Sequence, residues 1–273
     1  MAVGGSMSKA DRERSARDRL AEERRRVAAQ QRRRRLLVVV LGAVAAVAVV
    51  VVIVVVALGN QGGDGGPAAQ KYTGPIAPAT RQQDGSVAMA NSGVTAPVLD
   101  VFEDFQCPAC KAMEARVGGT IKKLAAEGRV KVVYRPFQLF QQDPLMSNSR
   151  RAANAAACMP ADHWVKYHDK LYAEQPPEGD KGFSNPDLIK WAGQLGVTDP
   201  AFAACVNGAQ KIGQVDQATA YAGKVGVTAT PYLALNGRQL GDDALASSDA
   251  LQKAVAQAGS GTPRSAGTAP AQR

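Results

Sequence analysis

The chain has 273 residues and a formal net charge of +9, from 33 Lys and Arg against 24 Asp and Glu. This excess is local, because residues 1–35 hold 12 basic and 5 acidic side chains, which leaves 21 and 19 for the remaining residues. A nucleic-acid-binding domain needs a basic face on its folded body, so this distribution argues against a nucleic-acid partner.

An apolar run of 23 residues follows this basic tail, from Leu36 to Leu58, and contains no charged side chain. As a helix it would be about 34 Å long, enough to cross a bilayer core of about 30 Å. Basic flanks stay in the cytoplasm, so residues 1–35 are expected inside and the residues after 58 outside. A cleaved signal peptide is the alternative, but its apolar region would be only about 7–15 residues long. We therefore predict a single-pass anchor in the lipid bilayer over residues 36–58.

The next segment, residues 59–85, is rich in Gly, Pro, Ala and Gln and lacks hydrophobic periodicity. Such a composition predicts a flexible linker. Residues 258–273 have a similar composition and are predicted to form a disordered tail. The folded part is therefore expected over residues 86–257, which suits one domain.

Hydrophobic periodicity within this domain predicts an ordered series of elements. They are a strand (98–105), a helix (107–127), a strand (129–137), a long helical stretch (147–221), a strand pair (231–240) and a last helix that is capped by Ser248 or Asp249 and runs to about 257. In the strand pair, Asn236-Gly237 is a strong signal for a type I′ hairpin turn. This order predicts an α/β core with a helical insertion at about residues 140–222.

All four cysteines follow the apolar run, at positions 107, 110, 158 and 205. An even number of cysteines confined to one side of a predicted anchor fits an oxidising, extracytoplasmic compartment. The charge asymmetry and the cysteine positions therefore predict the same location.

The pair Cys107 and Cys110 could bind a metal, staple the fold or exchange electrons. A closed zinc site needs four ligands, and no second short-spaced cysteine pair accompanies Cys158, Cys205, His163 and His168, so we predict no metal site. A permanent disulfide across two residues would close a very small loop and add little stability. The spacing therefore favours redox chemistry, with no bound cofactor needed.

The predicted position of Cys107 at a helix start explains how such chemistry would work. Backbone N–H groups and the helix dipole stabilise a thiolate there, and the thiolate is the reactive form. Pro108 suits the first helical position because its missing N–H would have no partner there. Cys110 lies one turn later and would resolve a mixed disulfide formed at Cys107.

The segment FEDFQCPACKAME, residues 102–114, closely resembles the DsbA-like thiol-disulfide oxidoreductases of the thioredoxin superfamily, especially membrane-anchored forms of Gram-positive bacteria. The segments VKVVYRPFQL, HWVKYHDKLY, AFAACV and VGVTATPYLALNG follow in the family's order. The resemblance implies a thioredoxin fold with a helical insertion. It also implies that Thr230-Pro231 is the cis-proline that packs beside the cysteines and helps to hold the substrate backbone, and that Gln106, Pro108 and Ala109 flank the reactive sulfurs.

Two positions depart from the family pattern. Ala109 stands where the best-known strong oxidases carry His, so the thiolate would lack a positively polarised neighbour. Val101 stands where the family often has a buried acid that handles protons. Glu103 and Asp104 are nearer to the cysteines and could assist proton transfer, or they could be solvent-facing carboxylates at the end of the strand.

The second cysteine pair, Cys158 and Cys205, falls in the predicted insertion. The resemblance implies a structural disulfide between two insertion helices, with a relay pair or free buried thiols as alternatives. Close by, His163, Trp164, Tyr167 and His168 form a helical stripe. We expect this stripe to pack between insertion and core, and a ligand or acid–base role for either His is the alternative.

Together these features predict a membrane-tethered, extracytoplasmic, monomeric oxidoreductase that introduces disulfides into unfolded secreted proteins. The resemblance implies a quinone-linked membrane partner of the DsbB or VKOR type that reoxidises it. One alternative is a reductase or isomerase with the same site, which Ala109 and Val101 keep open. Another is a non-catalytic substrate-binding or chaperone module, for which a Cys107→Ser change would leave the biological role intact.

Overall fold

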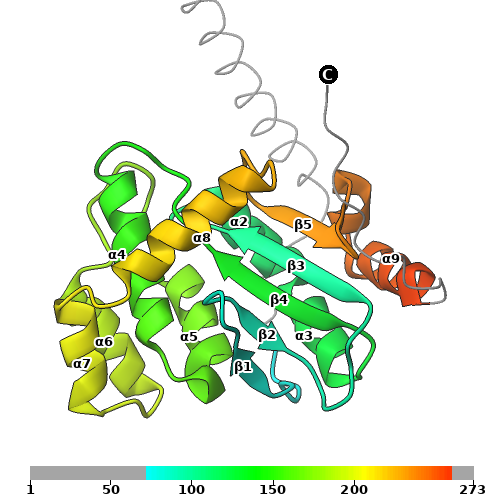
Figure 1. The fold of residues 1–273 in the computed structure, drawn as a ribbon, viewed down its shortest axis with the longest axis horizontal. Helices are drawn as coiled ribbons and strands as arrows, with labels where there is room; N and C mark the ends of the chain where they lie inside the picture. The colour runs from blue at the N-terminus through cyan, green and yellow to red at the C-terminus, as the bar shows by residue number, and fades with distance from the viewer. Residues whose placement is uncertain (1–71, 260–273) are drawn as a thin grey trace, which may run out of the picture. The chain divides into compact units, whose positions relative to one another are not determined.

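The computed structural model describes residues 72–259 (Figure 1). Its strands are β1 (Ala79–Arg81), β2 (Val87–Met89), β3 (Val98–Glu103), β4 (Lys131–Pro136), β5 (Tyr232–Leu235) and β6 (Arg238–Gln239). Its α-helices are α2 (Pro108–Met113), α3 (Gly119–Ala126), α4 (Leu145–Cys158), α5 (Ala161–Ala173), α6 (Asn185–Gln194), α7 (Pro200–Asn207), α8 (Ile212–Lys224) and α9 (Ser248–Gly259). A π-helical turn, Glu114–Gly118, joins α2 to α3, and a 3-10 turn, Asp242–Leu245, precedes α9.

The strands form one mixed sheet in the order β1-β2-β4-β3-β5-β6. Strand β3 pairs in parallel with β4 and antiparallel with β5, so it lies inside the sheet. Successive side chains of a strand point to opposite faces. Val101 accordingly packs into the main core with residues of α2 and α3, whereas Phe102 packs with Phe137, Ala222 and Val227 under α8. Burial on both faces fixes the strand that leads to Cys107.

Helices α4 to α8 lie between β4 and β5 in the chain, and Figure 1 shows them gathered at one end of the sheet. They confirm the predicted α/β core with a long helical insertion. Side-chain caps separate the helices: Ser184 accepts a hydrogen bond from the Asp187 N–H, and Asp199 accepts one from the Ala201 N–H. Such caps satisfy N–H groups that have no partner within the helix.

The predicted hairpin turn is confirmed between β5 and β6. Asn236 and Gly237 have φ angles of 51° and 75°, and a type I′ turn needs positive φ at both central residues. The last helix, α9, runs from Ser248 to Gly259, two residues into the segment predicted as a disordered tail. The predicted cap at Ser248 or Asp249 is wrong by one residue, because the Ser247 hydroxyl accepts the capping hydrogen bond from the Ala250 N–H at 3.2 Å.

Two short strands correct the sequence prediction, because β1 lies inside the segment predicted as a flexible linker and β2 was not predicted. They pair with each other, and β2 also pairs with β4. The Arg81 guanidinium donates hydrogen bonds to the carbonyl groups of Ala156 and Met159, at 3.1 and 2.8 Å. These contacts join residues about 75 positions apart, so local composition could not indicate them.

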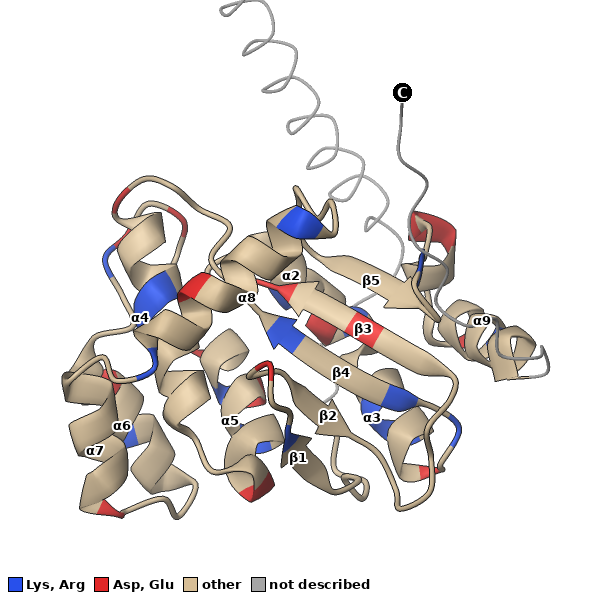
Figure 2. Cartoon of the chain, in the orientation of Figure 1, with Lys and Arg blue, Asp and Glu red and all other residues tan. Residues whose placement is uncertain are grey.

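The predicted basic tail, membrane anchor and first part of the linker lie outside the described residues, as do residues 260–273. Across residues 72–259, no helix combines the length and apolar character of a bilayer-spanning segment. Basic residues lie on α3, α4, β4 and α8, and acidic residues lie on β3, α5 and α8 (Figure 2).

Candidate functional site

Cys107 is the N-cap residue of α2, with an extended backbone (φ −77°, ψ 118°). Its carbonyl accepts hydrogen bonds from the N–H groups of Cys110 and Lys111, at 3.1 and 3.2 Å, and so starts the helix. Pro108 occupies the first helical position. Because β3 ends at Glu103 and the helix starts at Pro108, the strand delivers the Cys107 sulfur to the positive end of the helix.

The two cysteines are free thiols here, and they differ strongly in acidity. The hydrogen bond from the Cys110 thiol contributes most to lowering the pKa of Cys107, to about 6. Burial opposes this shift, while Thr230 and the N–H groups of Ala109 and Cys110 support it. Burial raises the pKa of Cys110 well above its ordinary value, and the neighbouring Cys107 adds to the effect. At neutral pH the pair therefore holds a thiolate at Cys107 and a thiol at Cys110.

The Thr230-Pro231 segment lies directly beside Cys107. Its peptide bond is cis, and the Thr230 carbonyl oxygen lies 3.6 Å from Cys107 Sγ. Pro108 and Ala109, in the first turn of α2, are exposed. A polypeptide that reaches Cys107 would therefore contact the first turn of α2 and the Thr230-Pro231 segment.

Asp104 is fully buried, so the alternative of a solvent-facing carboxylate is wrong for this residue. Its carboxylate accepts hydrogen bonds from the N–H groups of Gln106 and Leu139, both at 2.8 Å, and from the Ser149 hydroxyl at 2.7 Å. Burial raises the pKa of Asp104, and these hydrogen bonds oppose that shift. Asp104 thus ties the active-site turn to α4 and to the segment before it.

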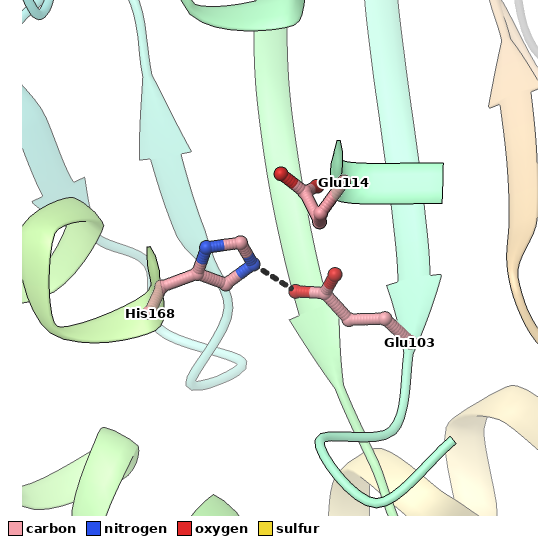
Figure 3. Close-up of side chains that lie close together, drawn as sticks. All are labelled: Glu103, Glu114 and His168. Carbon is pink, nitrogen blue, oxygen red and sulfur yellow. Dashed lines mark hydrogen bonds and ion pairs between the residues drawn. The ribbon is translucent and has the colours of Figure 1, made fainter. Parts of the chain in front are cut away.

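Glu103 is also fully buried, which corrects the same alternative for this residue, because α5 covers the end of β3. Its Oε1 lies 2.8 Å from His168 Nε2, on α5 (Figure 3). The π-helical turn brings Glu114 toward the same point, and Figure 3 shows the three side chains facing one another. The proton-transfer role that the sequence assigns to Glu103 or Asp104 stays a prediction.

Sequence patterns indicated no functional role for Glu114, and for His168 they predicted chiefly packing between insertion and core. That role is confirmed, because the His168 ring contacts the rings of Tyr134 and Trp164 with centroids 4.9 and 5.1 Å apart. Burial alone would lower the pKa of His168, but nearby carboxylates, Glu103 foremost, raise it to about 10. Burial raises the pKa of Glu114. His163, in contrast, is partly exposed and pairs with Asp162 at 2.9 Å.

Polar side chains of the insertion hold the active-site turn in place. The Gln175 side chain donates hydrogen bonds to the carbonyl groups of Phe105 and Cys107, at 2.7 and 3.0 Å. Asn148 donates one to the Gln106 side chain at 2.9 Å. Gln175 and Asn148 carry no motif, so the sequence analysis missed them.

Cys158 and Cys205 form a disulfide between the last residue of α4 and α7. Within the described residues, the bond links two helices of the insertion and does not touch the Cys107–Cys110 pair. The structure thus has the pairing that the family resemblance implies.

A family model described as thioredoxin matches residues 93–257 of the chain. A search of curated proteins finds no significant match.

The chain is also similar to solved structures of thiol-disulfide exchange proteins. The chain is similar to the reduced disulfide bond oxidoreductase DsbG of Mycobacterium tuberculosis, with 28% identity, a TM-score of 0.56, and coverage of 64% of this chain and 88% of that one. It is similar to oxidised DsbA of the same organism, with 28% identity, a TM-score of 0.54, and coverage of 68% and 94%. BdbD of Bacillus subtilis, at 19% identity and a TM-score of 0.58, shares the fold over 69% of this chain and 100% of its own.

Proposed function

The chain belongs to the thioredoxin family and is a DsbA-like thiol-disulfide oxidoreductase, and from that premise we propose that it introduces disulfides into secreted proteins. The observation that carries the proposal is the position of Cys107 at the N-terminus of α2, next to the exposed Pro108 and Ala109 and one turn before the fully buried Cys110. This placement agrees with the lowered pKa of Cys107, about 6, and the raised pKa of Cys110. Enzymes of this type use a redox-active cysteine pair in place of a bound cofactor.

The first step starts from the Cys107–Cys110 disulfide. A substrate thiolate attacks Cys107 Sγ, because this sulfur lies beside the exposed turn at Pro108 and Ala109. The bond between the two cysteines breaks, and its electron pair goes to Cys110, which takes up a proton because its pKa is high. The substrate is then joined to Cys107 by a mixed disulfide.

The second step releases the product. A second substrate thiolate attacks the substrate sulfur of the mixed disulfide, and Cys107 leaves as a thiolate. A sulfur with a low pKa leaves faster, so the pKa of about 6 favours this step. The substrate has then lost two electrons and gained a disulfide, while the enzyme is reduced. We propose that a quinone-linked membrane partner of the DsbB or VKOR type accepts these electrons.

Stabilisation of the thiolate also supports the oxidising direction. Because the pKa of Cys107 in the folded, reduced enzyme lies below the ordinary thiol value, ionisation of Cys107 stabilises the reduced form at high pH. This stabilisation is lost as the pH falls through about 6. At pH 7 the effect is about 1.4 kcal/mol, or about 30 mV for a two-electron couple. A more stable reduced form makes the disulfide a stronger oxidant.

We further propose that the enzyme works outside the cytoplasm while tethered to the membrane by residues 36–58. The uncharged run after the Arg-rich tail supports this topology. The Cys158–Cys205 disulfide supports an oxidising compartment. The 13 residues from Gly59 to Lys71 can span at most about 45 Å, which would keep the catalytic domain near membrane partners.

The test is the reduction potential of the full-length protein in glutathione buffers between pH 5 and 8. We expect a potential at pH 7 well above the thioredoxin value of about −270 mV. We also expect its slope to change near pH 6, from about −59 to about −30 mV per pH unit, because one proton fewer is then taken up per two electrons. A potential at or below the thioredoxin value would favour a reductase.

A further inference from the structure

We propose that Glu103, Glu114 and His168 form a binding site for a divalent transition metal ion, with Zn²⁺ as the representative ion. The site lies next to the redox pair, but the inference does not depend on the direction of electron flow. It rests on five observations: three ligand side chains that converge, buried carboxylate oxygens without donors, an imidazole oriented by a carboxylate, a charge that a divalent ion balances and a route of entry.

The three side chains come from separate elements and converge on one point (Figure 3). Glu103 ends β3, Glu114 opens the π-helical turn after α2, and His168 lies in the middle of α5. One ligand atom from each lies within 4.8 Å of the other two. If the two Glu side chains rotate, all three ligand atoms can lie about 2.0–2.2 Å from one zinc ion, which is the usual Zn–O and Zn–N distance.

Three carboxylate oxygens in this cluster have no hydrogen-bond donor among the described residues. They are Oε2 of Glu103 and both oxygens of Glu114. Glu103 is fully buried and only 7% of the Glu114 side chain is exposed, so these oxygens are shielded from bulk solvent. Lys122 stands 3.7 Å from Glu114 and is already paired with Asp169 at 2.8 Å. Buried carboxylates in this state favour a cation.

A carboxylate orients the His168 ring, as is usual for imidazoles that bind metal ions. Its Nδ1 lies 3.2 Å from Asp169 Oδ1, while its Nε2 points toward Glu103. In metal sites a carboxylate commonly fixes one ring nitrogen, so that the other is oriented toward the ion. Asp169 would therefore act as the outer support of the His168 ligand.

The charges of the cluster are also balanced by a divalent ion. Glu103, Glu114 and Asp169 bring three carboxylates, against one ammonium from Lys122. With a neutral His168 the sum is −2, which one divalent cation cancels. Two protons would cancel it as well, so protons are the competing occupants. One imidazole with two carboxylates suits Zn²⁺ better than Ca²⁺, which prefers six to eight oxygen ligands.

A cavity gives the ion access and leaves room for water ligands. Its volume is about 740 Å³, and Glu114, Lys122, Asp169 and Tyr172 are among its lining residues. Gly118 lies directly against the Glu114 side chain, because a Cβ at this position would overlap Glu114 Oε2. A side chain at position 118 would therefore push the Glu114 carboxylate away from its partners. π-helical turns such as this one occur frequently at functional sites.

The test is calorimetric titration of the full-length protein with zinc chloride, after oxidation of Cys107 and Cys110 so that their thiolates cannot bind zinc. We expect one ion per chain, and a higher melting temperature in its presence. Glu114→Gln should weaken binding by at least about 100-fold, and Gly118→Ala, which keeps all three ligands, by at least about 10-fold. Asp162→Asn is the matched control, because it removes the carboxylate of an exposed His–Asp pair.

Melting curves recorded without metal show whether each variant is folded. The proposal is overturned if the oxidised protein shows no saturable site for zinc up to about 1 mM, because protons alone then occupy the cluster. Equal zinc affinity in the folded Glu114→Gln variant would also overturn it. Calcium binding as tight as zinc binding would exclude His168 as a ligand.

Discussion

Replacement of Cys107 by serine is expected to abolish thiol–disulfide exchange, whereas replacement of Cys110 by serine is expected to trap the reaction halfway. A serine hydroxyl is not ionised at neutral pH, so Cys107→Ser removes the nucleophile and leaving group and should lower the rate by at least about 1000-fold. Cys110→Ser keeps the reactive Cys107 and removes the thiol that resolves its mixed disulfides. Mass spectrometry after incubation with a substrate that contains disulfides measures both outcomes.

The Cys110→Ser variant should accumulate one substrate molecule per chain, attached at Cys107 and released by a reducing agent. The double variant Cys107→Ser/Cys110→Ser is the control for attachment at Cys158 or Cys205, and it should capture no substrate. If Cys107→Ser protein still supports disulfide formation at the normal rate, the chain acts as a binding or chaperone module instead of an exchange catalyst.

Removal of the second disulfide, in a Cys158→Ala/Cys205→Ala variant, is expected to lower the free energy of unfolding by about 4 kcal/mol. The bond closes a loop with a sequence separation of 47, and restriction of the unfolded chain by such a loop gives about this value. Denaturant titration of the oxidised proteins measures the difference. Ser147→Ala, in the first turn of α4, is a control that leaves the disulfide intact.

The same Cys158→Ala/Cys205→Ala variant shows whether the second disulfide is purely structural or relays electrons. Because the bond joins α4 to α7 and does not touch Cys107 or Cys110, we expect exchange in the folded variant to stay within about twofold of normal. If exchange is lost while the variant is still folded, the second pair passes electrons to or from the first.

Local sequence patterns were sufficient to predict the helices, strands and turns that position the cysteine pair. The strand-like segment at residues 98–105, and Pro108 directly after Cys107, predicted the change from strand to helix that places the sulfur at a helix start. The Asn236-Gly237 turn was likewise predicted from two residues, because both must adopt positive φ. In each case the physical cause lies within a few residues of its effect.

Contacts between distant segments were not predictable in this way. Strands β1 and β2 have three residues each and are stabilised by pairing, so their sequences resemble linker. Glu103 and His168 are 65 residues apart, and only the packing of α5 over the end of β3 joins them. Glu114 has no motif, and the π-helical turn that directs it inward has no signature in the sequence. The sequence therefore predicted no metal site, and the proposed one depends on tertiary structure alone.

The central claim is that the oxidised protein donates its Cys107–Cys110 disulfide, and the most direct test is transfer to a reduced, unfolded secreted protein. The oxidised full-length chain is mixed with an equimolar amount of this substrate without oxygen, and free thiols are then alkylated and located by mass spectrometry. We predict that the substrate gains one disulfide per chain, while Cys107 and Cys110 become free and the Cys158–Cys205 bond persists. The claim is contradicted if no disulfide is transferred, or if the reduced chain instead reduces the disulfides of the folded substrate.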